Sequence, residues 1–128
     1  CLSNMYFNKN YEFGFGEDAD FGMQLRNKGY DVLYFPTPKI LHLKAPIGGF
    51  RTPHVFLWNK EEFQPKPSPT VMLYRLVYYT KEQLAGYKTN LYFKFYPSQQ
   101  IKNPISYLKN MNKRWEISLL WAKKLMQE

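Results

Sequence analysis

The stretch FGEDADFGMQLRNKGY, residues 15–30, carries the clearest local pattern of the chain. Its three acidic side chains lie at the start of a run with helical spacing, where they favour the positive end of a helix dipole. Phe21 and Leu25 lie four residues apart and share one helical face. A lysine and then Gly29 end the run, as is typical of a helix C-terminus. The pattern therefore predicts a helix over roughly residues 17–28.

Two short runs rich in β-forming residues follow this helix. Residues 30–35 read YDVLYF and end at Pro36, and residues 39–43 read KILHL. A helix, a glycine, a short strand, a proline turn and a second short strand form an α/β pattern. We therefore expect the α/β class, or α+β within this chain alone, with these two segments as strands.

The middle of the chain reads as a long loop. Residues 44–69 lack periodicity and are rich in glycine and proline: Pro46, Gly48, Gly49, Pro53, Pro65, Pro67 and Pro69. Long loops in compact domains are usually functional or mobile.

Helical signals dominate the remainder of the chain. Thr70 can cap a helix over residues 71–79, which is apolar nearly all round. Thr80 and Gln83 have the spacing of a capping box and predict a second helix that runs into Tyr87-Lys88.

A last helix is expected over residues 104–127, because Asn103 precedes a proline and proline suits the first helical position. Apolar side chains recur along it at helical spacing, at Trp115, Leu119, Ala122 and Met126, and further apolar residues widen this face: Ile117, Leu120, Trp121 and Leu125. An amphipathic helix of this kind needs an apolar partner. The C-terminal half is therefore expected to be mostly helical and packed on an apolar surface.

Composition narrows the class of protein. The chain has 128 residues, of which 45% are hydrophobic, enough for a core of its own. It contains neither a glycine-rich phosphate loop nor an apolar run of about 18 residues that could span a membrane. A single cysteine, Cys1, excludes an internal disulfide framework and a cysteine zinc site. Because the chain starts there without a methionine, and no secretory signal is visible, we expect a fragment.

Charge is distributed unevenly. Residues 1–50 hold five Lys/Arg and five Asp/Glu, whereas residues 51–128 hold 13 basic and five acidic side chains and therefore the whole net charge of +8. A basic half suggests an anionic neighbour, such as a membrane surface, a phosphorylated substrate or nucleic acid. A lysine-rich surface that only keeps the protein soluble is the alternative.

Three sets of residues could carry chemistry. Glu17 and Asp18 could supply a general base or metal ligands, or merely stabilise a helix start. They are adjacent, so at most one is expected to face a reacting centre. His42 could bind a divalent transition metal or be a structural histidine. Two glycines and two cations could close over a phosphate or belong to an ordinary exposed loop: Lys44, Gly48, Gly49 and Arg51.

Taken in order, these features resemble the C-terminal catalytic motif of the family 2 glycosyltransferases. The similarity covers residues 7–51, which are about a third of the chain. It consists of an acidic pair that opens a helix, a Leu-Arg-x-x-Gly-Tyr ending over residues 25–30, a short strand, Pro36 and a histidine on the next strand. Asn8 departs from the pattern, because an aspartate is usual at that position.

The resemblance implies a GT-A fold, in which a Rossmann-like donor half precedes the acceptor-side portion found here. It implies that Asp18 deprotonates the acceptor hydroxyl, with Glu17 as the alternative base. It also implies that His42 helps to bind a divalent cation, Mn or Mg, at the donor diphosphate. Asp18-Ala19-Asp20 has the DxD spelling but lies in the acceptor-side motif, so the metal-binding DxD is expected in the donor half.

The resulting expectation is a fragment of an inverting, hexosyltransferase-type enzyme. It would transfer a sugar from a UDP- or GDP-type donor to a glycan or lipid-linked acceptor, in polysaccharide or glycolipid biosynthesis. Residues 1–51 would be the acceptor-side catalytic segment, residues 52–69 the proline-rich loop and residues 70–128 a helical extension. The isolated chain is expected to be inactive and to self-associate through an exposed strand edge and its last helix. A cytoplasmic location fits, with contact to the inner face of the membrane as an option.

Two other classes of function fit parts of the sequence. One is a non-catalytic, basic module that docks on a partner or a membrane. The other is a small nucleic-acid-binding domain, which only net charge and aromatic content favour. No RNP-like, zinc-finger or helix-turn-helix signature is present, so nucleic acid is not expected as a partner.

Overall fold

The computed structural model describes residues 5–39, 41 and 54–127 of the 128-residue chain. Within these ranges the regular structure consists of α-helices and short 3-10 helices, in the order η1 (Lys9–Tyr11), α1 (Glu17–Asn27), η2 (Leu57–Lys60), α2 (Pro69–Tyr78), α3 (Lys81–Phe95) and α4 (Pro104–Leu125).

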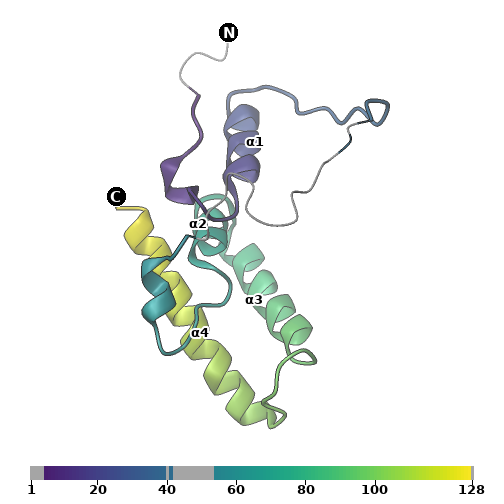
Figure 1. Ribbon diagram of the computed structural model, residues 1–128. Helices are drawn as coiled ribbons and strands as arrows, with labels where there is room; N and C mark the ends of the chain where they lie inside the picture. The colour runs from purple at the N-terminus through teal and green to yellow at the C-terminus, as the bar shows by residue number, and fades with distance from the viewer. Residues whose placement is uncertain (1–4, 40, 42–53, 128) are drawn as a thin grey trace.

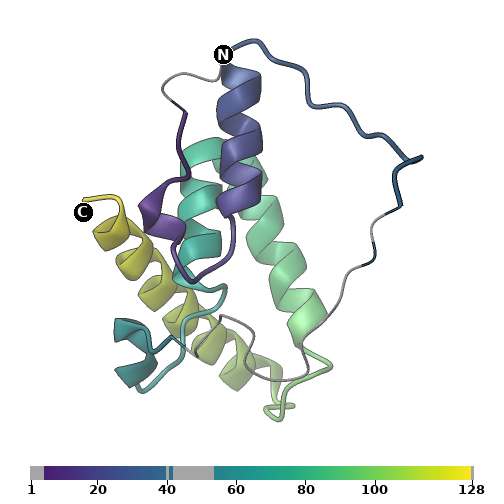
Figure 2. The same cartoon turned by 45° about the horizontal axis from the view of Figure 1, so that its top comes forward.

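Three helices form the body of the molecule, and α1 stands at one end of it (Figures 1 and 2). α2 packs along α4, and this is the most extensive contact between two elements of the described chain. α3 and α4 form a helical hairpin whose connecting loop lies at the end opposite to α1 (Figure 1). The acidic start of α1 and the tip of this hairpin therefore lie far apart.

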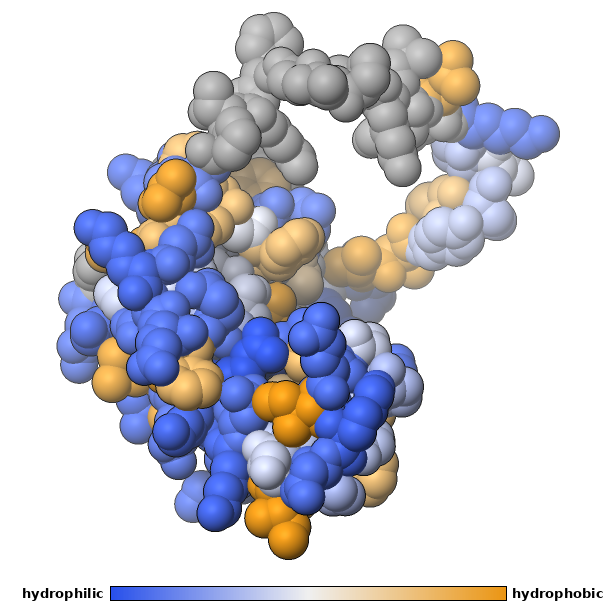
Figure 3. All heavy atoms as spheres, turned by 60° about the horizontal axis from the view of Figure 1, so that its bottom comes forward, coloured by the Kyte–Doolittle hydropathy of each residue, from blue (hydrophilic) through white to orange (hydrophobic). Residues whose placement is uncertain are grey.

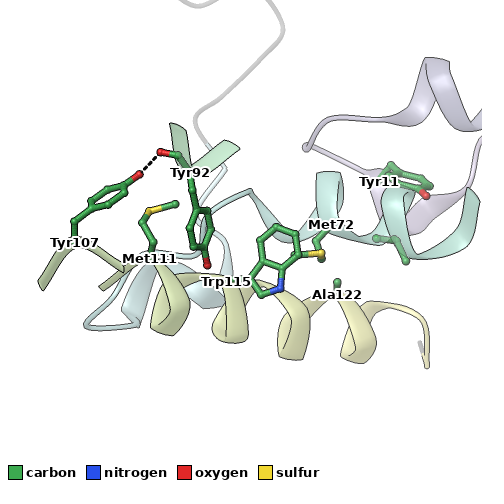
Figure 4. Close-up of a cluster of buried hydrophobic side chains, with 8 residues drawn as sticks. Tyr11, Met72, Tyr92, Tyr107, Met111, Trp115 and Ala122 are labelled. Carbon is green, nitrogen blue, oxygen red and sulfur yellow. Dashed lines mark hydrogen bonds between the residues drawn. The ribbon is translucent and has the colours of Figure 1, made fainter. Parts of the chain in front are cut away.

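The core lies between α2, α3 and α4 (Figure 4). α4 supplies most of it through a stripe with helical spacing: Tyr107, Met111, Trp115, Ser118 and Ala122. Met72 from α2 is fully buried, and Tyr92 from α3 places its ring edge-on to Trp115, with the centroids 6.4 Å apart. The Tyr107 hydroxyl donates a hydrogen bond of 2.6 Å to the Tyr92 carbonyl, which ties α4 to α3. A stripe of this kind gives a helix most of its stability.

The expected α/β or α+β class, with the GT-A architecture that the resemblance implied, is wrong for the described residues, which contain helices and no strand. Residues 30–35 are extended and exposed, with Leu33 at 71% and Tyr34 at 88% of full exposure. The physical reason is that a strand is completed by hydrogen bonds to a neighbouring strand, and no other described segment lies beside this run. Residues 39–43 fall mostly outside the described residues.

The local helix signals were better guides. The helix expected at residues 17–28 is α1. Thr80 and Gln83 form the expected capping box, and the Asn103 side chain accepts a hydrogen bond of 3.0 Å from the Ser106 amide at the start of α4. α3 runs beyond the expected Tyr87-Lys88 to residue 95.

Two details of the expected helices were wrong. Ser68, rather than Thr70, occupies the cap position of α2. The Thr70 hydroxyl instead accepts a hydrogen bond of 3.1 Å from the Phe15 amide, so it anchors the segment that leads into α1. On α4, Leu120 and Met126 are about half exposed and lie outside the buried stripe.

The described part of the proline-rich loop packs along α4. Its η2 segment buries Trp58, whose ring lies 6.0 Å from that of Trp121. The Trp121 indole donates a hydrogen bond of 2.8 Å to the Glu61 carboxylate, and the Arg114 Nε donates one of 2.7 Å to the Gln64 carbonyl. This segment is therefore a packed strap. Because the described residues have no strand, the exposed sheet edge that was expected to drive self-association is absent from them.

The tyrosines of the core make stability sensitive to alkaline pH. Burial, with a smaller contribution from the neighbouring Tyr107 and Glu116, raises the pKa of Tyr92 from 10.0 to about 12. The unfolded chain, with the lower pKa, loses this proton first, so the stabilising contribution is complete below about pH 10 and is lost as pH rises to about 12. We expect the free energy of unfolding in urea to fall over this range.

Tyr92→Phe should make that fall shallower, because it removes one of the ionising groups. It also removes the hydrogen bond of 2.9 Å from the Tyr92 hydroxyl to Asn112, so the slope with pH is compared and not the absolute stability. The control is Tyr34→Phe, because Tyr34 is 88% exposed. Equal slopes for the two variants would contradict the assignment.

Candidate functional site

The acidic start of α1 depends on two glycines that precede it. A side chain at Gly14 would lie 2.5 Å from the Thr70 methyl group, so only glycine lets the chain pass this close to α2. Gly16 has a φ of 119°, in the left-handed region that L side chains rarely adopt, and a Cβ there would lie 3.1 Å from the Tyr11 ring. These positions hold the start of α1 against η1 and α2.

The third acid of the motif, Asp20, is a structural residue. It is 3% exposed, and both of its carboxylate oxygens accept hydrogen bonds. The Tyr78 hydroxyl donates one of 2.8 Å from α2, and the Gln24 side-chain amide donates one of 2.7 Å from the next turn of α1. Buried carboxylates require such partners. Asp20 therefore fastens α1 to α2, and each of its oxygens has a protein donor.

Two tyrosines beside Asp20 have raised pKa values. Burial raises the pKa of Tyr78 well above its ordinary value, and the hydrogen bond to Asp20 and the charge of that carboxylate add to the effect. Burial likewise raises the pKa of Tyr11, which is 1% exposed, again with a contribution from the Asp20 charge. Both phenols therefore remain protonated at neutral pH.

The remaining two acids differ in their surroundings. Glu17 is half-buried and borders a cavity of about 320 Å³. Aromatic side chains form much of its wall, together with polar groups of η1 and the turn after it: Phe7, Asn8, Lys9, Tyr11, Glu12 and Phe13. Asp18 is exposed at the same helix start but does not line this cavity. The two adjacent carboxylates therefore have different surroundings.

Phe13, on the wall of this cavity, has an unusual backbone. Its φ is 62°, a left-handed conformation that costs a bulky residue on the order of 1–3 kcal/mol. Its ring stacks on His54 with the centroids 4.3 Å apart and the planes 5° from parallel. Strain of this kind is tolerated where surrounding contacts fix it, and it clusters at functional sites.

The ring stack continues from the cavity toward α4. Phe56 meets His54 edge-on and stacks on Trp58, whose ring approaches Trp121 of α4. The chain after residue 53 is therefore tied both to the cavity and to the helical body.

The other residues expected to act in the site lie outside the described residues: His42, Lys44, Gly48, Gly49 and Arg51. Among the residues that the structure does describe, no group of three or more His, Cys, Asp or Glu could hold a metal ion. The two acids of the DxD-spelled pair differ in their surroundings, since Asp20 is buried with protein donors on both oxygens, whereas Asp18 is exposed.

Two site features were missed from sequence. Tyr78 is the partner of Asp20 from 58 residues away, and the sequence gives no signal for that pairing. The cavity wall from Phe7 to Phe13 could have been suspected from the density of aromatic residues before the acidic motif.

Comparison of the chain with protein-family models, with curated proteins and with solved structures finds no match. None of the helices in the described part of the chain is both long enough and apolar enough to cross a membrane.

Proposed function

We propose that this chain supplies the acceptor-side portion of an inverting glycosyltransferase, which moves a sugar from a nucleotide-sugar donor to the hydroxyl of a glycan or lipid-linked acceptor. The observation that carries the proposal is that the three acids of the GEDAD motif differ in burial and in contact with the cavity. Asp20 is buried and accepts hydrogen bonds from protein side chains, whereas Asp18 is exposed and Glu17 borders a cavity with aromatic walls.

In this proposal Glu17 helps to bind the acceptor in the cavity, and Asp18, outside the cavity at the same helix start, is the general base for an acceptor hydroxyl that projects from it. A carboxylate in the first turn of a helix is stabilised by the helix dipole. Asp18 removes the proton of the acceptor hydroxyl as its oxygen attacks the anomeric carbon of the donor. The bond to the nucleotide diphosphate breaks at the same carbon, so the configuration is inverted. The aromatic walls suit the apolar face of a sugar ring, and the polar groups between them can orient its hydroxyls.

A divalent cation, which the resemblance implies, would stabilise the departing diphosphate. The described residues offer no ligand set for it, and His42, its expected ligand here, lies outside them. The steps assigned to this chain are therefore acceptor binding and proton removal.

The proposal is tested by acceptor-dependent release of nucleotide from a panel of UDP- and GDP-sugars. A full-length protein in which a donor-binding half precedes this chain should release nucleotide faster when a glycan acceptor is added. The 128-residue chain alone should release none above the background of its Asp18→Asn variant. Transfer by the chain alone would contradict the division into donor and acceptor portions, and no release by the full-length protein would contradict the function.

A further inference from the structure

The tip of the α3–α4 hairpin exposes apolar side chains to water. The hairpin tip is defined here by Phe93, Lys94, Ile101, Ile105, Leu108 and Lys109. Phe93 is 76% exposed, Ile105 67% and Leu108 48%. Phe93 and Leu108 also edge a groove of about 550 Å³ between the two helices. An apolar surface of this kind marks an interaction site.

The same region is purely cationic. Residues 83–115, which run from α3 through the loop into α4, contain six Lys/Arg and no Asp/Glu. Figure 3 looks onto this end of the molecule and shows apolar side chains surrounded by hydrophilic ones. Apolar groups framed by lysines and free of acids are typical of proteins that bind at the surface of an anionic bilayer.

From these two observations we propose that the hairpin tip docks on the surface of an anionic lipid bilayer. Phe93, Ile105 and Leu108 would enter the boundary between head groups and acyl chains. Lys94 and Lys109 would lie against the anionic head groups, with their apolar stems along the bilayer surface. Because α1 stands beyond α2, on the side of the molecule away from the tip (Figure 1), the docked chain keeps the acidic site, where α1 begins on α2, away from the bilayer. The proposal does not depend on the glycosyltransferase function.

Nucleic acid fits this surface less well, because Phe93 is the one aromatic ring among the residues that define the tip, and the neighbouring tyrosines and Arg114 make contacts within the protein. The Tyr92 hydroxyl donates to Asn112, that of Tyr107 to the Tyr92 carbonyl, and that of Tyr96 to the Lys102 carbonyl. Arg114, the arginine of this region, donates to Gln64 and lies over the Phe95 ring. Single strands are bound through several free rings on which successive bases stack, and the tip offers one, Phe93.

A second copy of the chain also fits less well. Two tips brought face to face would place two sets of cations, with no acidic side chain of residues 83–115 to offset them, against each other. Such like-charge contact is unfavourable. A bilayer with anionic lipids offers both the opposite charge and an apolar phase.

The experiment is co-sedimentation of the 128-residue chain with vesicles of phosphatidylcholine, with or without phosphatidylglycerol, at physiological salt. We expect binding to the anionic vesicles, weakened by added salt, and much weaker binding to the neutral ones. The double variant Lys94→Gln/Lys109→Gln should bind anionic vesicles about thirtyfold more weakly, at roughly fivefold for each lysine. Its matched control, Lys81→Gln/Lys123→Gln, removes two exposed lysines from the far ends of the same helices and should bind like the unmodified chain.

The apolar contribution is tested in the same assay. Ile105→Ser/Leu108→Ser should weaken binding by about tenfold or more, because these side chains leave water on docking. Leu120→Ser, at an equally exposed position of α4 away from the tip, should have little effect. Helical circular dichroism confirms that each variant is folded.

Three results would overturn the proposal. The first is equal binding to neutral and anionic vesicles, or none to either. The second is an equal loss in the tip and control variants. The third is that the tip residues matter for another partner and not for vesicles. That partner would be a fluorescent single-stranded oligonucleotide, or a second copy of the chain detected as a dimer in sedimentation velocity.

Discussion

Asp18→Asn in the full-length protein should lower the turnover number for sugar transfer by a factor of about 10²–10⁴, with little change in donor affinity. The substitution keeps the size of the side chain and removes its capacity to accept the acceptor proton. Asp18 is exposed in the first turn of α1. The loss should therefore appear in the chemical step, measured as the initial rate at saturating donor and acceptor.

Two further variants serve as a control and as a test of the second acid. Asp31→Asn removes an exposed acid just beyond α1 and should retain activity. Glu17→Gln should raise the KM for the acceptor more than it lowers turnover, because Glu17 borders the cavity. If Asp18→Asn kept most of its activity and Glu17→Gln were inactive, the two roles would be exchanged.

Trp115→Ala should destabilise the chain by about 3–5 kcal/mol, the range for removing a large aromatic side chain from a core. Trp115 is 7% exposed at the centre of the α4 stripe, where its ring packs against Tyr87 and Tyr92 of α3. Its loss opens a void between the two helices that the rigid rings around it cannot fill. The free energy of unfolding in urea, followed by helical circular dichroism, measures the effect.

Leu120→Ala is the matched comparison for this variant. Leu120 lies on the same helix but is 50% exposed, so its truncation should change stability by about 0.5 kcal/mol or less. Similar losses for the two variants would mean that α4 does not bury the face described here.

Helices were predictable from sequence where the signals that define them are local. The acids before Phe21 and the glycine at position 29 delimit α1, and the Thr80–Gln83 box starts α3. The end of α3 was missed because residues 89–95 are rich in aromatic and polar side chains with little helical periodicity. Packing of Tyr92 against α4, which depends on residues far along the chain, keeps that segment helical.

Strands were not predictable because a β-rich run specifies a strand only together with a partner. Residues 30–35 have the composition of a strand, but in the described chain they remain extended and exposed. The strap before α2 was read as a loop because the contact between Trp58 and Trp121 joins residues that no local pattern connects.

The candidate site was predictable in part. The acidic motif and its place at a helix start followed from sequence. The burial of Asp20 did not, because it depends on Tyr78 of α2. That long-range hydrogen bond separates one structural acid from two available ones.

The most direct measurement is the anomeric configuration of the product, read by NMR after the full-length protein is incubated with an α-linked nucleotide sugar and a glycan acceptor. The proposal predicts a new β-glycosidic bond, formed by the unmodified protein and by Asp31→Asn but lost in Asp18→Asn. An α-linked product, or transfer that survives the loss of both Glu17 and Asp18, would contradict it.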